Sequence, residues 1–221
     1  MSSTKKTALS LASSLTIFSA FVVGMLDAYS TIHNDGTIMS AQTGNLVNLA
    51  VKLGTGHFSG LANHFSLLIG FAIGCILSVF ILRLFKEKKN RQMILWTVFT
   101  IFIWMIALLG AHLSEFMSIS ALSFSAGVAL SFFRELRSSN LNNGIMTGNL
   151  KNMYGALVDV FVYREVKKLP EALNLLTVII IFFLGSFIGG LISNIGLTAI
   201  LFVAAIICLI PYVQLFMSKE Q

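Results

Sequence analysis

The sequence predicts an all-α integral membrane protein that forms one domain over residues 1–221, and three observations carry this prediction. The chain is 56% hydrophobic and only 11% charged, whereas a soluble domain carries about 25% charged residues. Six apolar runs are each long enough to cross the roughly 30 Å of hydrocarbon in a bilayer. A short polar sequence, TGNLVN at residues 43–48, returns as TGNLKN at residues 147–152.

Six membrane spans are expected at about 8–30, 64–85, 92–112, 118–136, 172–193 and 196–217. The first run resembles a signal peptide, because Lys5 and Lys6 precede it and small residues lie near its end. The apolar run continues into a segment at residues 24–28 to which we assign a function below. We therefore expect this run to be the first span rather than a cleaved leader.

The segments after each TGN sequence, at about 44–53 and 148–160, are too short to span the membrane. At 1.5 Å per residue, the first covers on the order of 15 Å, or half a bilayer. We expect both segments to be re-entrant half-helices, which enter the membrane and return to the side from which they came.

The basic residues predict the orientation, because short cytoplasmic loops are rich in Lys and Arg. With six spans and a cytoplasmic N-terminus, Lys52 alone of the 15 basic residues lies outside. Eight full spans would instead put the loop at residues 83–91 and the N-terminal lysines on opposite sides. The sequence thus predicts a multi-pass protein of the cell membrane with both termini in the cytoplasm.

The two TGN sequences belong to a wider repeat, at about 8–112 and about 118–217. Each half reads as a span, a TGN segment, a span with a GxxIG motif, and a further span. Because three spans per half is an odd number, the halves lie in opposite orientations, which defines two inverted three-span repeats. The shared positions are Gly24 and Gly127 before the TGN sequences, then Gly70, Gly74 and Ser78 in one half and Gly185, Gly189 and Ser193 in the other.

Helix starts inside a membrane expose free backbone N–H groups, which attract anions or polar groups. Thr43 and Thr147 are suitable N-cap residues, and a glycine after each leaves room for a ligand or another backbone. Asparagines three residues apart share one helical face. The candidate binding residues are therefore Thr43, Gly44, Asn45 and Asn48 in one half and Thr147, Gly148, Asn149 and Asn152 in the other. The alternative is that these asparagines only tie the short helices to neighbouring spans.

Two charged residues stand out. Asp27 is the one acid well inside a predicted span, and a carboxylate in the membrane commonly serves proton coupling. It also lies near the outer end of its helix, so it could instead reach the interface. Arg134 follows Gly127 in the second half and could pair with Asp27 across the site or hold an anion. The alternative for Arg134 and Arg137 is that they are ordinary cytoplasmic anchors.

The remaining polar residues favour structural roles. The GxxxG pairs favour close helix packing over ligand binding. Cys75 and Cys208 lie in separate apolar runs, where buried thiols act as small hydrophobes. The four histidines, which lack metal-ligand spacing, are expected in exposed outer segments: His33, His57, His64 and His112. We find no catalytic motif, so we expect no enzyme, no metal and no cofactor, and the scattered basic clusters do not suggest a nucleic-acid partner.

The chain resembles the YoaK-like family of small multi-pass bacterial membrane proteins, a domain of unknown function. The first half matches the family pattern at Gly24, Asp27, Ala28, Thr43, Gly44 and Asn45, and the second at Gly127, Arg134, Thr147, Gly148 and Asn149. The family's Gln-Asn-Ala is replaced here by residues 129–131, Ala-Leu-Ser. The resemblance covers nearly the whole chain and implies no established activity.

Inverted repeats that meet at short or broken helices are the layout of many secondary transporters. We therefore expect a transporter of a small molecule or ion, proton-coupled through Asp27, with its site at the TGN helix starts. A passive channel for a small neutral or anionic solute is the first alternative, and a structural or regulatory membrane protein is the second. The expected partners are the lipid bilayer and this solute, and self-association into a homo-oligomer is left open.

Overall fold

A computed structural model describes residues 2–34, 37–137, 139–141 and 146–217. Six helical segments in the described part are long and apolar enough to cross a membrane, which confirms the predicted spans. Five are α1 (Ser2–His33), α3 (Leu61–Leu84), α4 (Lys88–Leu109), α5 (Glu115–Phe132) and α7 (Leu169–Ser193); the sixth comprises α8 (Leu197–Ile207) and α9 (Ile210–Met217). The shorter elements are α2 (Gln42–Thr55), α6 (Met146–Phe161), two 3₁₀ turns (Gly110–His112 and Val166–Lys168), β1 (Glu135–Leu136) and β2 (Ser139–Asn140).

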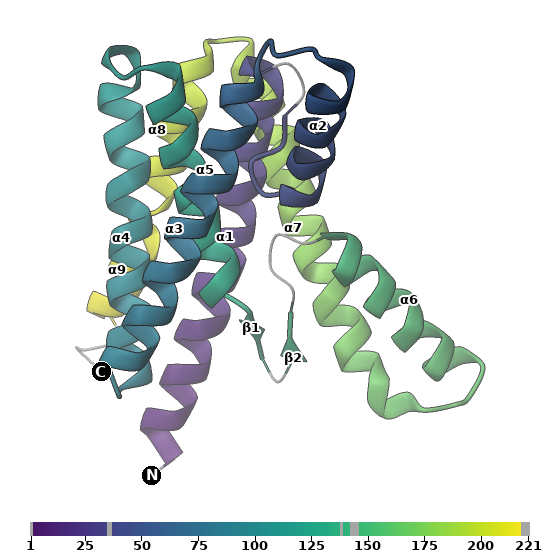
Figure 1. Cartoon of the computed structure of the whole chain (residues 1–221). Coiled ribbons are helices and arrows are strands. Elements are labelled where there is room, and N and C mark those ends of the chain that lie inside the picture. The colour runs from purple at the N-terminus through teal and green to yellow at the C-terminus, as the bar shows by residue number, and fades with distance from the viewer. Residues whose placement is uncertain (1, 35–36, 138, 142–145, 218–221) are drawn as a thin grey trace.

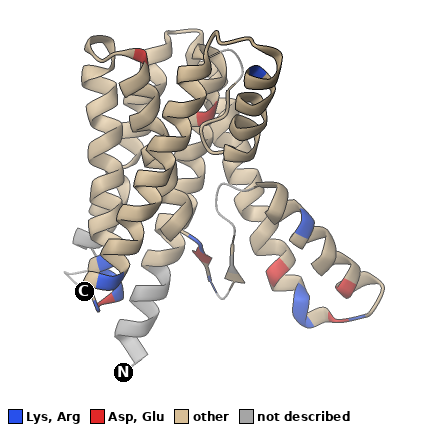
Figure 2. Cartoon of the chain, in the orientation of Figure 1, with Lys and Arg blue, Asp and Glu red and all other residues tan. Residues whose placement is uncertain are grey.

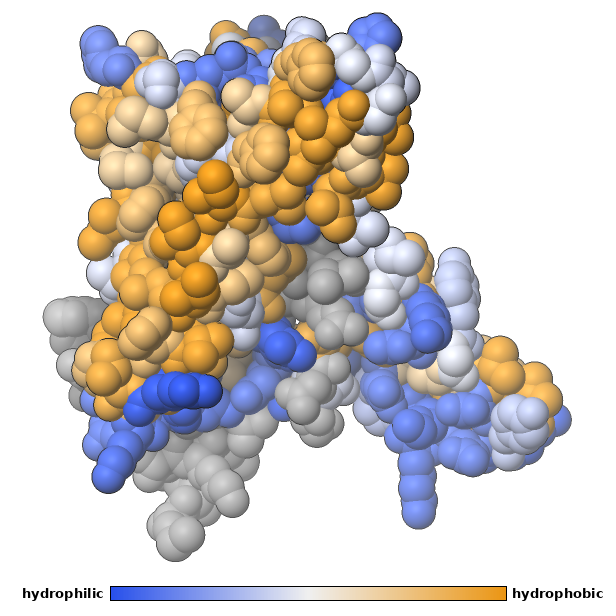
Figure 3. Space-filling model, in the orientation of Figure 1, coloured by the Kyte–Doolittle hydropathy of each residue, from blue (hydrophilic) through white to orange (hydrophobic). Residues whose placement is uncertain are grey.

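The long helices run alternately up and down, so that α1 begins and α9 ends at the same end of the molecule (Figure 1). We call this the basal end, and the opposite end, where α1 finishes, the distal end. Hydrophobic side chains cover much of the visible face of the bundle between the two ends (Figure 3). Phe80, Ile73 and Phe183, for example, are all more than half exposed. An exposed apolar surface of this kind is suited to lipid contact, and the chain has the character of a multi-pass membrane protein.

The last predicted span is interrupted. Residues 208–209 form a turn between α8 and α9, and Pro211 is the second residue of α9. A proline lacks the backbone N–H that would bond to the preceding turn, so it starts a helix readily but cannot continue one. The break therefore follows from the sequence locally, and the apolar character of the segment is kept on both sides of it.

The fourth span is shorter than expected, because a small hairpin replaces its predicted last turn. Helix α5 ends at Phe132, and β1 and β2 then pair antiparallel with Glu135 opposite Asn140. Arg137 lies in the hairpin turn with a φ of 54°. Leu136 is buried in a small cluster with residues of α1, α6 and α7. The predicted end at residue 136 is thus wrong, since the Ser- and Asn-rich stretch that follows favours a turn.

The main core lies among α1, α4, α5 and α8. Trp96 of α4 is fully buried at its centre, and its indole N–H donates a hydrogen bond of 3.0 Å to the carbonyl oxygen of Cys208. Its ring packs edge-on against Phe133 at a centroid distance of 5.2 Å. Both cysteines are free; Cys208 is buried and Cys75 is half-buried. The polar N–H of the tryptophan is therefore satisfied inside an otherwise apolar core.

Two helix pairs pack closely through glycines. In the pair α1–α7, a methyl group at Gly24 would collide with the carbonyl oxygen of Phe182, and one at Gly185 with that of Phe21. In the pair α3–α5, a methyl group at Gly74 would collide with the carbonyl oxygen of Phe124, and one at Gly127 with that of Phe71. The predicted packing role of the glycine motifs is confirmed, because small residues let two helix backbones approach.

Candidate functional site

The two TGN segments lie in short helices that begin at the middle level of the molecule. Helix α2 runs from there towards the distal end, and α6 runs towards the basal end (Figure 1). They contain 14 and 16 residues, fewer than a full span needs. Their main partners differ, since α2 packs on α3 and α6 packs on α7. Each short helix thus lies beside the GxxIG span of its own half.

The predicted N-caps are wrong. Helix α2 has Ala41 at its N-cap with no side-chain hydrogen bond, so Thr43 lies inside the first turn. Helix α6 begins at Met146, so Thr147 is its second residue. Both threonines are exposed. The start of α2 is held instead by Gln42, whose Nε2 donates to the carbonyl oxygen of Met39 at 2.6 Å, a bond that the TGN sequence alone does not suggest.

Asn45 joins α2 to the chain that leads into it. Its side chain is 2% exposed, and Nδ2 donates to the carbonyl oxygen of Ile38 at 3.2 Å and to Oε1 of Gln42 at 3.3 Å. Gln42 in turn donates to Oγ of Ser123 in α5 at 3.1 Å. The hydroxyl of Ser123 donates to the carbonyl oxygen of Leu67 in α3 at 2.6 Å. One connected polar network therefore links α2 to two spans.

The equivalent residue of the second half, Asn149, is also fully buried, with Nδ2 3.8 Å from the sulfur of Met146. The second asparagine of each segment differs, because Asn48 and Asn152 are exposed. In each short helix, therefore, the first asparagine of the motif is buried and the second is exposed, although the two are three residues apart. A methyl group at Gly44 would have no neighbour within 4 Å, so no other backbone approaches it, and Gly148 is half-buried.

Asp27 is 4% exposed and lies two turns before the end of α1. Its carboxylate accepts hydrogen bonds from the backbone N–H of Ser40, at 3.0 Å, and from the Ser40 hydroxyl. Nearby, the hydroxyls of Ser30 and Thr37 lie 3.4 Å apart. No ion pair of Asp27 occurs among the described residues. The buried carboxylate thus accepts hydrogen bonds from Ser40 but has no cationic partner there.

Arg134 does not pair with Asp27. It follows the end of α5 and is exposed. Helix α5 ends towards the basal end, whereas α1 ends at the distal end (Figure 1), so the two helices carry these residues away from each other. The interpretation of Arg134 as half of a charge pair is therefore not supported, and its surroundings fit an anchor near the membrane surface.

A second polar group, missed by the sequence analysis, lies at the basal side of the middle level. A guanidinium nitrogen of Arg137 donates to Oδ1 of Asn174 at 3.2 Å, and Nδ2 of Asn174 donates to Oγ of Ser139 at 2.9 Å. Asn174 is 1% exposed. The backbone N–H of Arg137 also donates to the Ser13 hydroxyl at 2.8 Å. This group fixes the hairpin to α1 and α7, and an asparagine inside an apolar span was its only signal.

The histidines are placed as expected except for one. His33, His57 and His112 are exposed, but His64 is 5% exposed in the first turn of α3 and its Nδ1 has no hydrogen-bond partner. The expectation of an exposed loop is thus wrong for His64, because α3 begins three residues before it. No group of three or more metal-ligating side chains occurs in the described part of the chain.

Residues 15–213 match a protein family described as a protein of unknown function, DUF1275. The match covers most of the six spans and both TGN segments. The chain belongs to this family. No curated protein and no solved structure matches the chain. The family match agrees with the resemblance inferred from the paired motifs, and the family description names no activity.

Proposed function

We propose that this protein is a secondary transporter of a small molecule or ion, and that Asp27 is its coupling residue. The observation that carries the proposal is the state of this carboxylate, which is 4% exposed and contacts only uncharged donors among the described residues. A buried carboxylate without a cation is costly in its ionised form. Such a group is suited to take up a proton or a cation and to release it when its surroundings change.

The directions of the short helices support an inverted arrangement. Helix α2 leaves the middle level in one direction and α6 in the other. Under the proposal both are re-entrant half-helices in two inverted three-span repeats. Their starts then face a common region from opposite sides of the membrane, as in many transporters built from such repeats. The termini lie in the cytoplasm, and the protein resides in the cell membrane.

The glycine contacts support the same symmetry. In the pair α1–α7, Gly24 lies against the backbone of Phe182 and Gly185 lies against the facing helix. In the pair α3–α5, Gly127 and Gly74 make the equivalent approaches, with Gly127 against the backbone of Phe71. The hydrogen bonds agree, since the Ser186 hydroxyl donates to the carbonyl oxygen of Gly24 at 3.0 Å and the Cys75 thiol to that of Gly127 at 3.7 Å. The first span of each half thus packs on the GxxIG span of the other half, which gives two equivalent pairs.

These contacts align the halves differently from the motifs. The sequence motif pairs Gly70 with Gly185, whereas the contacts pair Gly74 with Gly185, four residues or about one helical turn further on. The alignment by helix contacts is preferred to the alignment by sequence, because a glycine every four residues allows the same motif to be matched in two registers. The corrected correspondence also pairs Asn63 with the buried Asn174.

The groups around Asp27 favour a small polar solute. Asn45, Gln42 and Ser123 offer uncharged donors and acceptors within one network, and no basic side chain of the described residues joins it. We propose that the solute or the coupling ion binds between Asp27 and the start of α2, and that Asn149 takes part from the second half.

Electrical recording from the reconstituted full chain tests this proposal. Proteoliposomes on a solid-supported membrane would receive amino acids, carboxylates, sugars and alkali cations in turn, with and without a pH gradient. We expect a solute-dependent current that Asp27→Asn abolishes. The control Glu165→Gln removes an exposed acid of the loop after α6 and should leave the current unchanged.

Two outcomes would contradict coupling through Asp27. A flux whose size and pH dependence survive Asp27→Asn would favour the passive channel. If no solute gives a flux, and Asn45→Ala and Asn149→Ala change only the stability, the protein has a structural or regulatory role instead.

A further inference from the structure

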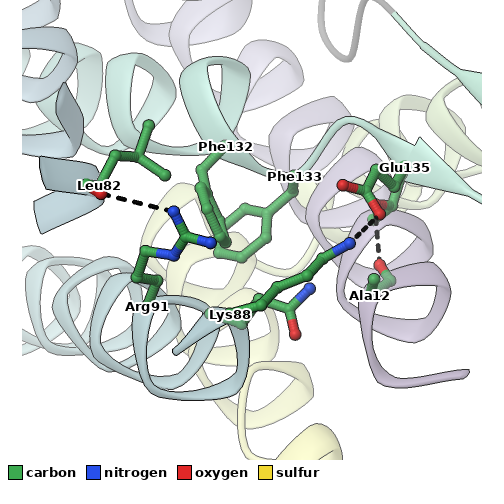
Figure 4. Close-up of a pocket in the computed structure, with 9 residues that line it drawn as sticks. Ala12, Leu82, Lys88, Arg91, Phe132, Phe133 and Glu135 are labelled. Atoms are coloured by element: carbon green, nitrogen blue, oxygen red, sulfur yellow. Dashed lines mark hydrogen bonds and ion pairs between the residues drawn. The ribbon is translucent and has the colours of Figure 1, made fainter. Parts of the chain in front are cut away.

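A second candidate site lies at the basal end, away from Asp27. It is a cavity of about 310 Å³ among α1, α3, α4 and the end of α5. Figure 4 shows its labelled residues, with the Arg91 side chain extending toward Phe132 and Phe133 and that of Lys88 toward Glu135. Its size is at the small end of the range for small-molecule pockets, which is about 300–1,000 Å³. A head group or a small metabolite fits such a space, and a dinucleotide does not.

Two buried polar atoms of the cavity lining have no hydrogen-bond partner among the described residues. Gln92 is 3% exposed, and its Oε1 accepts no hydrogen bond; Nε of the neighbouring Arg91 is also buried and donates to none. Buried polar atoms are nearly always paired in native proteins. One acceptor and one donor at the same cavity therefore indicate a ligand that presents a hydroxyl or N–H group together with an acceptor.

The charge of the cavity favours an anion. Lys88 is neutralised by an ion pair with Glu135 at 2.5 Å, but Arg91 forms no ion pair within the described chain, and its one assigned hydrogen bond is a long contact of 3.4 Å to the carbonyl oxygen of Leu82. Both basic residues lie in the first turn of α4, which contains no acid. The free N–H groups and the dipole of a helix start add further positive potential.

We propose that this cavity binds a phosphorylated polyol, with its phosphate on Arg91 and a hydroxyl group donating to Oε1 of Gln92. Arginine is well matched to phosphate oxygens. A ligand without a hydroxyl or N–H group would leave the Gln92 oxygen unpaired, and an uncharged polyol would leave the guanidinium without a counter-ion. The cavity lies where α3 and α5 end and α4 begins, a level that both a phosphatidylglycerol head group and a soluble glycerol phosphate can reach.

Binding to the purified full chain tests the proposal. Phosphatidylglycerol and phosphatidylcholine would be compared by native mass spectrometry, and glycerol 1-phosphate and inorganic phosphate by ligand-dependent thermal shift. We expect phosphatidylglycerol, glycerol 1-phosphate or both to bind at least about tenfold more tightly than the matched probe, a difference of about 1.4 kcal/mol. Binding of phosphatidylglycerol alone identifies a lipid source, and binding of glycerol 1-phosphate alone a soluble one.

Three variants assign the contacts. Arg91→Gln should weaken binding of either ligand by about tenfold, since a charge-assisted hydrogen bond is lost. Gln92→Leu should remove the preference for glycerol 1-phosphate over inorganic phosphate, or for phosphatidylglycerol over phosphatidylcholine, which a purely electrostatic role would not do. Lys89→Gln, an exposed neighbour that does not line the cavity, is the control.

Equal binding of the paired probes by the unaltered protein would overturn the proposal without any variant. An equal effect of Arg91→Gln and Lys89→Gln would also overturn it, because binding would then depend on general surface charge.

Discussion

Asp27 is bound by the loop that follows its helix. Ser40 donates two hydrogen bonds to the carboxylate, one from its backbone and one from its side chain. The loop carrying Ser40 leads directly into α2, so the position of the short helix and the state of the carboxylate are coupled. A change of charge at Asp27 is therefore expected to alter the position of the start of α2.

This coupling predicts the effect of Ser40→Ala. The change removes one donor to a buried carboxylate, and we expect it to lower the free energy of unfolding by about 1–3 kcal/mol. Unfolding by sodium dodecyl sulfate in mixed micelles would measure the difference. The control Ser59→Ala removes an exposed hydroxyl and should stay within about 0.5 kcal/mol of the parent. Equal stabilities of the two variants would show that the hydroxyl of Ser40 does not hold Asp27.

At this scale the sequence identified part of the site. Asp27 could be found because it is an acid within an apolar run, and Asn45 and Asn149 because their motif repeats. Ser40 and Gln42 could not be found, since a serine or glutamine beside a loop is ordinary in any sequence. Their roles arise from the path of residues 37–41, which turns the backbone N–H of Ser40 towards Asp27, 13 residues earlier in the chain.

Among the elements, the glycines decide which helices touch. Helix α1 packs on α7 and α3 packs on α5, at distances where a single methyl group would meet a backbone carbonyl oxygen. A carbonyl oxygen inside a helix cannot move aside as a flexible side chain can. The helices themselves must therefore separate when such a glycine is replaced, and both packing and the neighbouring polar groups are disturbed.

Helix α7 offers a matched test of this packing. Gly185→Ala should destabilise the protein by about 1–3 kcal/mol, as overpacked contacts do. Gly190→Ala lies in the same helix with no atom within 4 Å of the added methyl group, and it should be neutral or slightly stabilising, because alanine favours helix more than glycine. Thermal unfolding in detergent compares the two variants. A Gly185→Ala protein as stable as Gly190→Ala would show that α1 and α7 are not in close contact.

At the scale of the whole molecule, the charges separate the two ends. Figure 2 shows Lys and Arg around the basal end and along α6 and the loop after it, with one on α2 near the distal end. That residue is Lys52, the single basic residue of α2. Because basic loops stay in the cytoplasm, this distribution gives the basal end a cytoplasmic orientation under the proposed function.

Reporter fusions test this orientation directly. A fusion at Asn90, just inside the start of α4, should be cytoplasmic, whereas one at Gly60, just before α3, should be external. Paired alkaline phosphatase and fluorescent protein fusions distinguish the two sides, since each is active on only one of them. An external reporter at Asn90 would contradict the inverted arrangement of the two halves.

The sequence by itself determined the class of the protein, the six apolar spans and the two polar segments between them, because hydrophobicity over some twenty residues is a local property. It also indicated that glycines serve packing. Only the tertiary structure decided which glycines meet the backbone of a neighbouring helix. It likewise showed that Arg134 lies away from Asp27 and that Ser40 donates hydrogen bonds to Asp27. It also placed Gln92 in the lining of a cavity with basic residues. These features depend on contacts between residues far apart in the chain, whose geometry no local pattern records.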